Sequence, residues 1–280
     1  MSRIADCFVK LAQRGEGALI PYLMAGDPDL ERSYRYAQAL ITGGADLIEL
    51  GVPFSDPVAD GPTIQAAGSR ALANGVHLDE VFSLVSRLRS ESEIPLILMS
   101  YYNPIFRLGQ GLFLKRCLDE GVSGVIIPDL PIEEAGSYLE LARRYRVDTV
   151  FIATPETGEE RLAQISAQTG GFLYLVSRYG TTGAQEKLDP HAGQLIAQVR
   201  SRMPAELALG VGFGLSMPEQ ISAVIRAGAQ GAIVGSALVQ RVAQGRPPQE
   251  LADFVQELKG GTRLLQQKVG GWQPEAETST

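Results

Sequence analysis

The sequence contains only two cysteines and two histidines among its 280 residues. Cys7 and Cys117 lie far apart and no CxxC pair occurs, so neither a disulfide framework nor a cysteine zinc site is predicted. His77 and His191 have no metal-ligand partner at a useful spacing, and we expect them at surface or helix-capping positions. Two isolated thiols indicate a reducing compartment.

Long apolar runs and an excess of positive charge are also absent. No apolar run reaches the roughly 18 residues of a membrane-spanning helix, and the amphipathic start of the chain lacks the apolar core of a signal peptide. The 25 basic residues are outnumbered by 32 acidic ones, so no basic stripe for nucleic acid is indicated. These absences predict a cytoplasmic protein that binds neither nucleic acid nor membrane.

Eight short apolar runs recur along the chain, each ending near a glycine, a proline or a polar loop. They are 18–26, 46–52, 94–102, 122–130, 148–153, 171–177, 207–214 and 231–236. Because they do not alternate polar with apolar residues, both faces of each strand should be buried, as in a parallel sheet. Helical patterns fill the spaces between them. The sequence therefore predicts an α/β fold, a single (β/α)8 TIM barrel with an extra N-terminal helix and extra helices in the βα loops.

The strand count alone leaves an open, doubly wound sheet as the alternative. The predicted barrel domain spans residues 1–272, and the polar segment 273–280 is expected to be a disordered tail. Two connections are long: residues 60–95 hold more than one helix, and residues 177–194 are rich in glycine and threonine. Since long βα loops of a barrel lie at its catalytic face, the second is expected to act as a lid.

The segment LIELGVPFSDPVADGP, residues 47–62, places carboxylates where no basic residue is near. Glu49 falls at the carboxyl end of the second predicted strand, where barrel enzymes place their chemistry and where a buried carboxylate has no water. Asp60 follows eleven residues later, after a loop that can bring its side chain back to the same end of the barrel. The more buried carboxyl could shuttle protons while the other stays ionised. Alternatively, Glu49 is half of a buried ion pair and Asp60 a turn residue before Gly61.

Glycine-rich segments follow the seventh and eighth predicted strands. Ser216 and Glu219 have the spacing of a capping box, so a helix should begin beside Gly214, and Gly235 and Ser236 should begin another. Backbone N–H groups at two helix starts form an anion site, and barrels often bind phosphate at this position. No nucleotide P-loop, Ser-His-Asp arrangement or lysine site for pyridoxal phosphate is recognisable. The residues thus indicate acid–base chemistry on a small phosphorylated molecule.

These motifs resemble those of the tryptophan synthase alpha chain family, the indole-3-glycerol-phosphate aldolases. LIELGVPFSDPVADGPTIQ reads like that family's signature nearly residue for residue. The motifs GDPD, YYNPI, PDLP, YLVSRYGTTG, GFGLS and AIVGSA follow in order at family-like distances. The resemblance covers about residues 3–268.

The resemblance implies a role for each matched residue. Glu49 would be the general acid–base, and Asp60 would be the partner of the indole nitrogen. The phosphate contacts would be Gly183, Gly214, Gly235 and Ser236. The lid and the indole pocket would include Tyr22, Ile64, Tyr101, Tyr174, Thr182 and Phe213.

The implied activity is the retro-aldol cleavage of indole-3-glycerol phosphate to indole and glyceraldehyde 3-phosphate, a lyase step of tryptophan biosynthesis that needs no cofactor in this chain. Family members pair with a beta chain that carries pyridoxal phosphate and receives indole through a tunnel, in an alpha2beta2 heterotetramer. Pro53 and Asp56, on the loop 53–60, would meet that partner.

One departure from the family concerns the lid. Thr181 stands where the family usually has valine, and Tyr179 is bulkier than usual, so lid packing and its coupling to the partner are open. Two other functions remain possible: a stand-alone lyase that releases free indole, and a catalytically silent barrel that only binds and activates a beta chain.

Overall fold

The structure, a computed structural model, describes residues 1–176 and 191–263. Most of the predicted lid, with Tyr179, Thr181, Thr182 and Gly183, lies outside the described residues, as does the predicted tail 273–280. The strands are β1 (Ala18–Met24), β2 (Ile48–Gly51), β3 (Leu96–Met99), β4 (Gly124–Ile126), β5 (Asp148–Val150), β6 (Ile152–Ala153), β7 (Phe172–Val176), β8 (Ala208–Gly212) and β9 (Gly231–Val234).

The strands form a closed parallel barrel. Their order is β5-β4-β3-β2-β1-β9-β8-β7-β6, and every pairing is parallel. The two ends of this order, β5 and β6, are halves of one predicted strand that is interrupted at Phe151, whose carbonyl accepts from the Tyr174 N–H at 3.0 Å. The chain itself therefore closes the sheet. The predicted barrel is confirmed and the doubly wound alternative is wrong.

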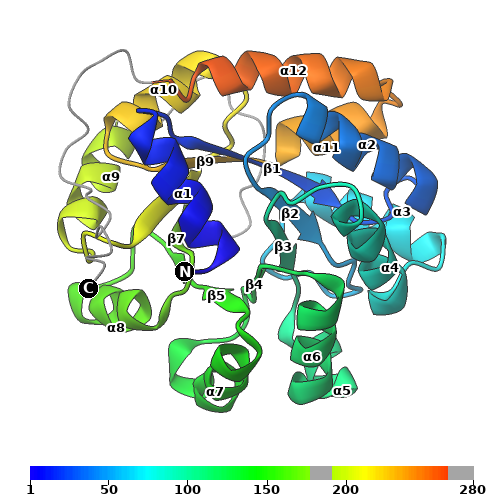
Figure 1. Cartoon of the computed structure of the whole chain (residues 1–280), viewed down its shortest axis with the longest axis horizontal. Coiled ribbons are helices and arrows are strands. Elements are labelled where there is room, and N and C mark those ends of the chain that lie inside the picture. The colour runs from blue at the N-terminus through cyan, green and yellow to red at the C-terminus, as the bar shows by residue number, and fades with distance from the viewer. Residues whose placement is uncertain (177–190, 264–280) are drawn as a thin grey trace, which may run out of the picture.

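A ring of helices surrounds the barrel (Figure 1). The helices that follow single strands are α2 (Leu30–Thr42), α7 (Gly136–Tyr145), α8 (Glu159–Gln168), α9 (Ala192–Ser201) and α10 (Pro218–Arg226), with a 3-10 turn (Ile132–Glu134) before α7. The predicted extra helices are α3 (Pro62–Ala73), α5 (Tyr102–Leu108) and α11 (Ser236–Ala243), which precede α4 (Leu78–Arg89), α6 (Gln110–Glu120) and α12 (Pro248–Gly260).

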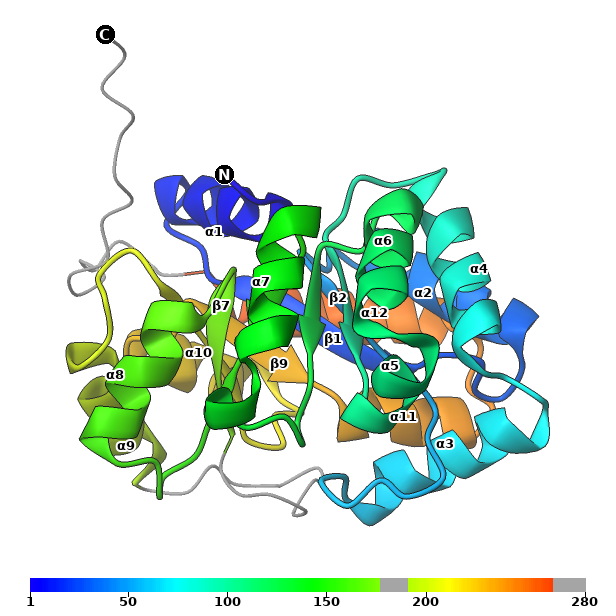
Figure 2. The same cartoon turned by 90° about the horizontal axis from the view of Figure 1, so that it is seen from below.

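The N-terminal helix α1 (Arg3–Gln13) closes one end of the barrel. Its buried residues Ile4, Phe8 and Leu11 join a core cluster formed by the inward side chains of the strands. The Phe8 ring lies 5.7 Å from the ring of Phe172. Since a Cβ on Gly231, the first residue of β9, would lie 3.3 Å from Phe8, α1 covers the amino ends of the strands. Figure 2 shows α1 on one face of the molecule and α3 and α11 on the opposite one.

The inner face of the barrel changes character from one end to the other. Inward residues alternate along a strand, so Ile20 is followed by Tyr22 on β1 and Phe172 by Tyr174 on β7. The amino-terminal layer is apolar and packs against α1, whereas the next layer carries hydroxyl and carboxyl groups. The sequence thus confines polar inward side chains to the carboxyl end, which is the open mouth.

An ion pair ties α12 to the amino end of the barrel. The Lys259 ammonium lies 2.7 Å from Oδ2 of Asp46, which also accepts from the Leu19 N–H at 2.7 Å. Both charged side chains are 14% exposed. This pair, remote from the mouth, anchors α12 to β1.

Phe8→Ala should lower the free energy of unfolding by about 3–5 kcal/mol, because it leaves a cavity between α1 and the barrel interior. Urea denaturation measures the loss. Phe106→Ala is the control, since Phe106 is 67% exposed and its truncation should change stability by less than about 0.5 kcal/mol. Equal losses in the two variants would show that α1 does not close the core.

Candidate active site

Glu49 is a buried carboxyl on the inner face of β2. Its backbone pairs in register with Tyr22 of β1 and Ile97 of β3, and the residue is 1% exposed. Oε2 has no hydrogen-bond partner in the described part of the chain. Burial, and then the charge of Asp60, raise the pKa of Glu49 to about 8, and no described cation opposes them. The alternative of a buried ion pair is therefore not found among the described residues.

Asp60 lies at the same mouth, at the end of the loop that follows β2. It is 9% exposed, and its backbone N–H donates to the Pro57 carbonyl at 3.0 Å, which fixes the last turn of the loop. Burial raises the pKa of Asp60 to about 6, and a hydrogen bond from the Tyr101 hydroxyl partly opposes that rise. Neutral pH thus lies between the two pKa values, so Glu49 is mostly protonated and Asp60 is mostly ionised at pH 7.

Two tyrosines line the mouth because glycines on the next strands leave room for their rings. A Cβ on Gly51 would lie 2.0 Å from the Tyr22 hydroxyl, and one on Gly212 would lie 2.7 Å from the Tyr174 hydroxyl. Burial is the main cause that raises the pKa of each tyrosine, and the charges of Asp60 and Glu49 raise it further. The two hydroxyls therefore lie close to the carboxyls. The predicted pocket residues Tyr22 and Tyr174 are thus brought together with both carboxyl groups.

The remaining predicted pocket residues come from neighbouring elements. Ile64 lies on α3 and is 5% exposed, Tyr101 directly precedes α5 and is 3% exposed, and Phe213 directly follows β8 and is 4% exposed. All three residues come after the carboxyl end of a strand: Ile64 after β2, Tyr101 after β3 and Phe213 after β8. Thr182, the sixth predicted residue, is outside the described residues.

The predicted phosphate residues lie beside two helix starts. Gly235 is the N-cap of α11 and Ser236 its first residue, and a Cβ on Gly235 would touch Tyr22 at 3.6 Å, so this helix start faces the mouth. Gly214, with a φ of 69° that favours glycine, leads from β8 toward α10. Gly183 lies outside the described residues.

The predicted capping box at α10 is wrong by one residue. The side chain of Gln220, not that of Glu219, turns back, and its Oε1 accepts from the N–H groups of Ser216 and Met217 at 2.8 and 3.1 Å. The N-cap is Met217 rather than Ser216. Gln220 thus already uses two backbone donors at the start of α10, whereas the N-cap of α11, Gly235, has no side chain that could form a cap.

The loop 53–60 is held by an aromatic contact that the sequence did not reveal. The Phe54 ring stacks on Tyr101 at 5.1 Å and 27°, and the Tyr101 hydroxyl accepts from the Ala59 N–H at 3.0 Å. Of the two predicted partner residues on this loop, Pro53 is buried and Asp56 is exposed. The only signal for the stack was an aromatic residue between two prolines.

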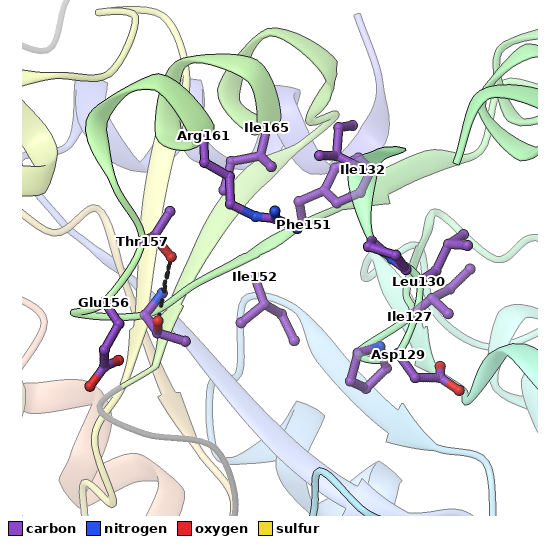
Figure 3. A pocket seen from close by; sticks show the side chains of 13 residues that line it. Ile127, Asp129, Leu130, Ile132, Phe151, Ile152, Glu156, Thr157, Arg161 and Ile165 are labelled. Atoms are coloured by element: carbon purple, nitrogen blue, oxygen red, sulfur yellow. Dashed lines mark hydrogen bonds between the residues drawn. The ribbon is translucent and has the colours of Figure 1, made fainter. Parts of the chain in front are cut away.

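A cavity of about 420 Å³ opens beside the mouth, at the carboxyl ends of β4 and β6 (Figure 3). Ile127, Phe151 and Ile152 give it an apolar wall. Arg161, on its rim, is paired with both carboxylate oxygens of Glu133, at 2.7 and 3.1 Å. The carboxylates Asp129 and Glu156 also line the cavity, so it combines an apolar wall with an acidic rim.

Residues 1–176 and 191–263 contain neither a candidate metal centre nor a candidate membrane-spanning helix. These residues contain no cluster of three histidine, cysteine or acidic side chains that could hold a metal ion. His77 is exposed and is the N-cap of α4, as predicted. No helix among them is both long and apolar enough to cross a membrane.

The family model for the tryptophan synthase alpha chain matches residues 8–267. The chain belongs to the tryptophan synthase alpha chain family. It is 45% identical over 260 residues to the tryptophan synthase alpha chain of Methanosarcina acetivorans, covering 92% of this chain and 93% of the relative. The alpha chain of Synechocystis is 45% identical over 262 residues. The family resemblance of the motifs is thereby confirmed.

Solved structures of tryptophan synthase agree with this assignment. The Mycobacterium tuberculosis tryptophan synthase superposes with a TM-score of 0.87 at 35% identity, over 94% of this chain and 99% of that chain. A tryptophan synthase complex from Pyrococcus furiosus gives a TM-score of 0.81 at 42% identity, over 88% and 99% of the two chains. As an alpha-chain-type barrel, the protein is a lyase of tryptophan biosynthesis.

Glu49→Gln should change how stability depends on pH. The pKa of Glu49 is raised from 4.5 to about 8, so its contribution to folding is fully present below pH 4.5 and is lost as the pH rises through about 8. Relative to wild type, the variant should gain on the order of 5 kcal/mol between pH 4.5 and pH 9. Urea denaturation across this range measures the gain. If the difference in stability between the two proteins stayed constant across this range, Glu49 would titrate normally.

Proposed function

We propose that Glu49 and Asp60 perform the family reaction, the cleavage of indole-3-glycerol phosphate to indole and glyceraldehyde 3-phosphate. One observation carries the proposal: Glu49 is buried at the mouth with no counter-charge among the described residues, and this burial raises its pKa to about 8. A carboxyl in such a site can give and take a proton near pH 7. A purely structural carboxyl would be paired.

In the proposed reaction Glu49 donates its proton to C3 of the indole ring. Positive charge then develops at N1, and the ionised Asp60 stabilises it at the same mouth. The Glu49 carboxylate takes the proton of the hydroxyl next to the ring, and a carbonyl forms as the bond between C3 and the side chain breaks. The electron pair of that bond returns to the ring, so indole and the aldehyde leave and Glu49 is again protonated.

The remaining residues orient the substrate. The start of α11, with Gly235 and Ser236, would hold the phosphate, helped by Gly214 and by Gly183. Tyr22, Ile64, Tyr101, Tyr174 and Phe213 would enclose the indole, and Thr182 would join them from the lid. We propose that this chain needs no cofactor for the reaction and acts in the cytoplasm, as one domain spanning residues 1–272.

The beta chain is the partner of this family, and we propose that it meets the carboxyl end of the barrel. Val58, on the loop 53–60, and Phe106, on α5, are apolar side chains that are 71% and 67% exposed. Tyr101 joins the two segments, because its hydroxyl holds the loop and its backbone leads into α5. Exposed apolar groups beside the mouth fit a surface over which indole passes to a partner that carries pyridoxal phosphate.

Glu49→Gln should abolish nearly all indole formation, because the amide keeps the shape but cannot transfer a proton. Asp60→Asn should leave weak activity and remove the rise of kcat/KM with pH near 6, since the charge partner of N1 is lost. Steady-state assays of indole release across pH 5–9, with and without beta chain, measure both effects. A tenth of wild-type turnover in Glu49→Gln would contradict the proposed role and favour a barrel that only activates its partner.

Phe106→Asp should weaken beta-chain binding at least tenfold, about 1.4 kcal/mol, because a charge replaces an apolar side chain in the proposed interface. The measurement is a titration with beta chain that follows indole formation. Leu118→Asp is the matched control, because Leu118 is 49% exposed on the last turn of α6, away from the mouth. Equal effects would place the interface elsewhere, and no stimulation of the wild type by beta chain would favour a stand-alone lyase.

A further inference from the structure

The position of Asp60 depends on helix α3, because α3 begins immediately after it. Gly61 is the N-cap, and Pro62 is the first helical residue. The Asp60 carbonyl accepts from the Gln65 side chain at 2.9 Å, which ties the residue to the first turn. A shift of α3 would therefore move the Asp60 carboxylate.

The buried face of α3 provides little apolar surface to fix the helix. Besides Ile64, its buried residues are Ala67, Gly68 and Ala71. A Cβ on Gly68 would lie only 3.5 Å from the methyl group of Met24, so the helix approaches β1 closely. Because stabilisation by burial scales with apolar area, alanine and glycine contribute less than larger side chains would.

A polar connection fixes the opposite end of α3 instead. Arg70 donates from Nε to Oδ1 of Asp27 at 2.7 Å and from a terminal nitrogen to Oδ2 at 2.8 Å. The Asp27 side chain is 2% exposed and that of Arg70 36%. Asn74 donates to the Pro28 carbonyl, so two side chains from the end of α3 form hydrogen bonds with the loop after β1.

Backbone packing supports the same connection. Gly26, at a φ of 81°, touches Val76: a Cβ there would lie 2.5 Å from a methyl group of Val76. The loop after β1 and the residues after α3 thus interlock. Since β1 also carries Tyr22, which is paired in register with Glu49, the connection places α3 relative to the strands of the active site.

We propose that Arg70 and Asp27 are positioning residues that hold the Asp60 carboxylate at the site where charge develops on the indole nitrogen. The inference rests on the function proposed for Asp60. Arg70 lies ten residues beyond Asp60, about 15 Å along a helix, so it acts through α3 and not by touching the substrate. A two-point contact between two planar groups fixes both the rotation and the axial position of the helix.

Arg70→Gln should lower kcat about tenfold or more and change KM for the phosphorylated substrate by less than about threefold. The positive charge at N1 is absent from the bound substrate and develops only once C3 is protonated, whereas the phosphate would be held at α11 throughout. Arg70→Lys keeps the charge but loses the two-point geometry, so it should fall between wild type and Arg70→Gln. If Arg70→Gln does not fold, Arg70→Lys takes its place.

The decisive experiment is a double-mutant cycle with Asp60→Asn. If Arg70 acts through Asp60, Arg70→Gln should reduce kcat by less than twofold once Asp60 is already Asn. Lys259→Gln is the matched control, because it breaks the other half-buried pair, with Asp46, at the amino end of the barrel. Its effect on kcat should be small and the same in both backgrounds.

Each outcome bears on a different claim. An equal loss from Arg70→Gln in the wild-type and Asp60→Asn backgrounds would overturn the positioning role while leaving the function of Asp60 intact. Unchanged activity in Asp60→Asn itself would refute the function of Asp60, and the positioning inference with it. Similar kcat losses in Arg70→Gln and Lys259→Gln would show that the connection contributes only to stability.

Discussion

The burial of one carboxyl without a counter-charge is the constraint on which this structure depends. Removing a carboxylate from water is so unfavourable that the group stays protonated unless a cation or several hydrogen bonds compensate. Glu49 has neither among the described residues, and the charge of Asp60 adds to the effect of burial. The same burial that makes Glu49 unfavourable as an ion suits it to the role of proton carrier that we propose.

The two ends of the barrel have different roles: contacts at the amino end stabilise the fold, and the carboxyl end holds the buried carboxyls. At the amino end, α1 packs on an apolar layer and the Lys259–Asp46 pair fixes α12, so these stabilising contacts lie away from the proposed site of reaction. At the carboxyl end, glycines on the strands leave room for tyrosine rings beside the carboxyls. The Asp27–Arg70 pair then holds a helix that has little apolar surface of its own.

Much of this arrangement could be predicted from the sequence, because it follows from local patterns. Apolar runs without alternation indicated the parallel strands, and an acidic residue inside such a run indicated Glu49. Contacts between distant segments left no comparable signal: Asp27 and Arg70 are 43 residues apart, and Phe54 meets Tyr101 only in the folded chain. The capping residue of α10 was misplaced because Glu219 and Gln220 are adjacent and both can reach back. Pro53, which the family resemblance places at a partner surface, is buried in the folded chain, and a resemblance of motifs carries no information on burial.

The protonation state of Glu49 tests the account most directly, and infrared difference spectroscopy between wild type and Glu49→Gln can observe it. The account predicts a carbonyl stretch of a protonated carboxylic acid that is present at pH 7, disappears as the pH rises through about 8 and is missing from the variant. A Glu49 that is already ionised at pH 6 would contradict the account, because a carboxylate without a proton could not begin the reaction.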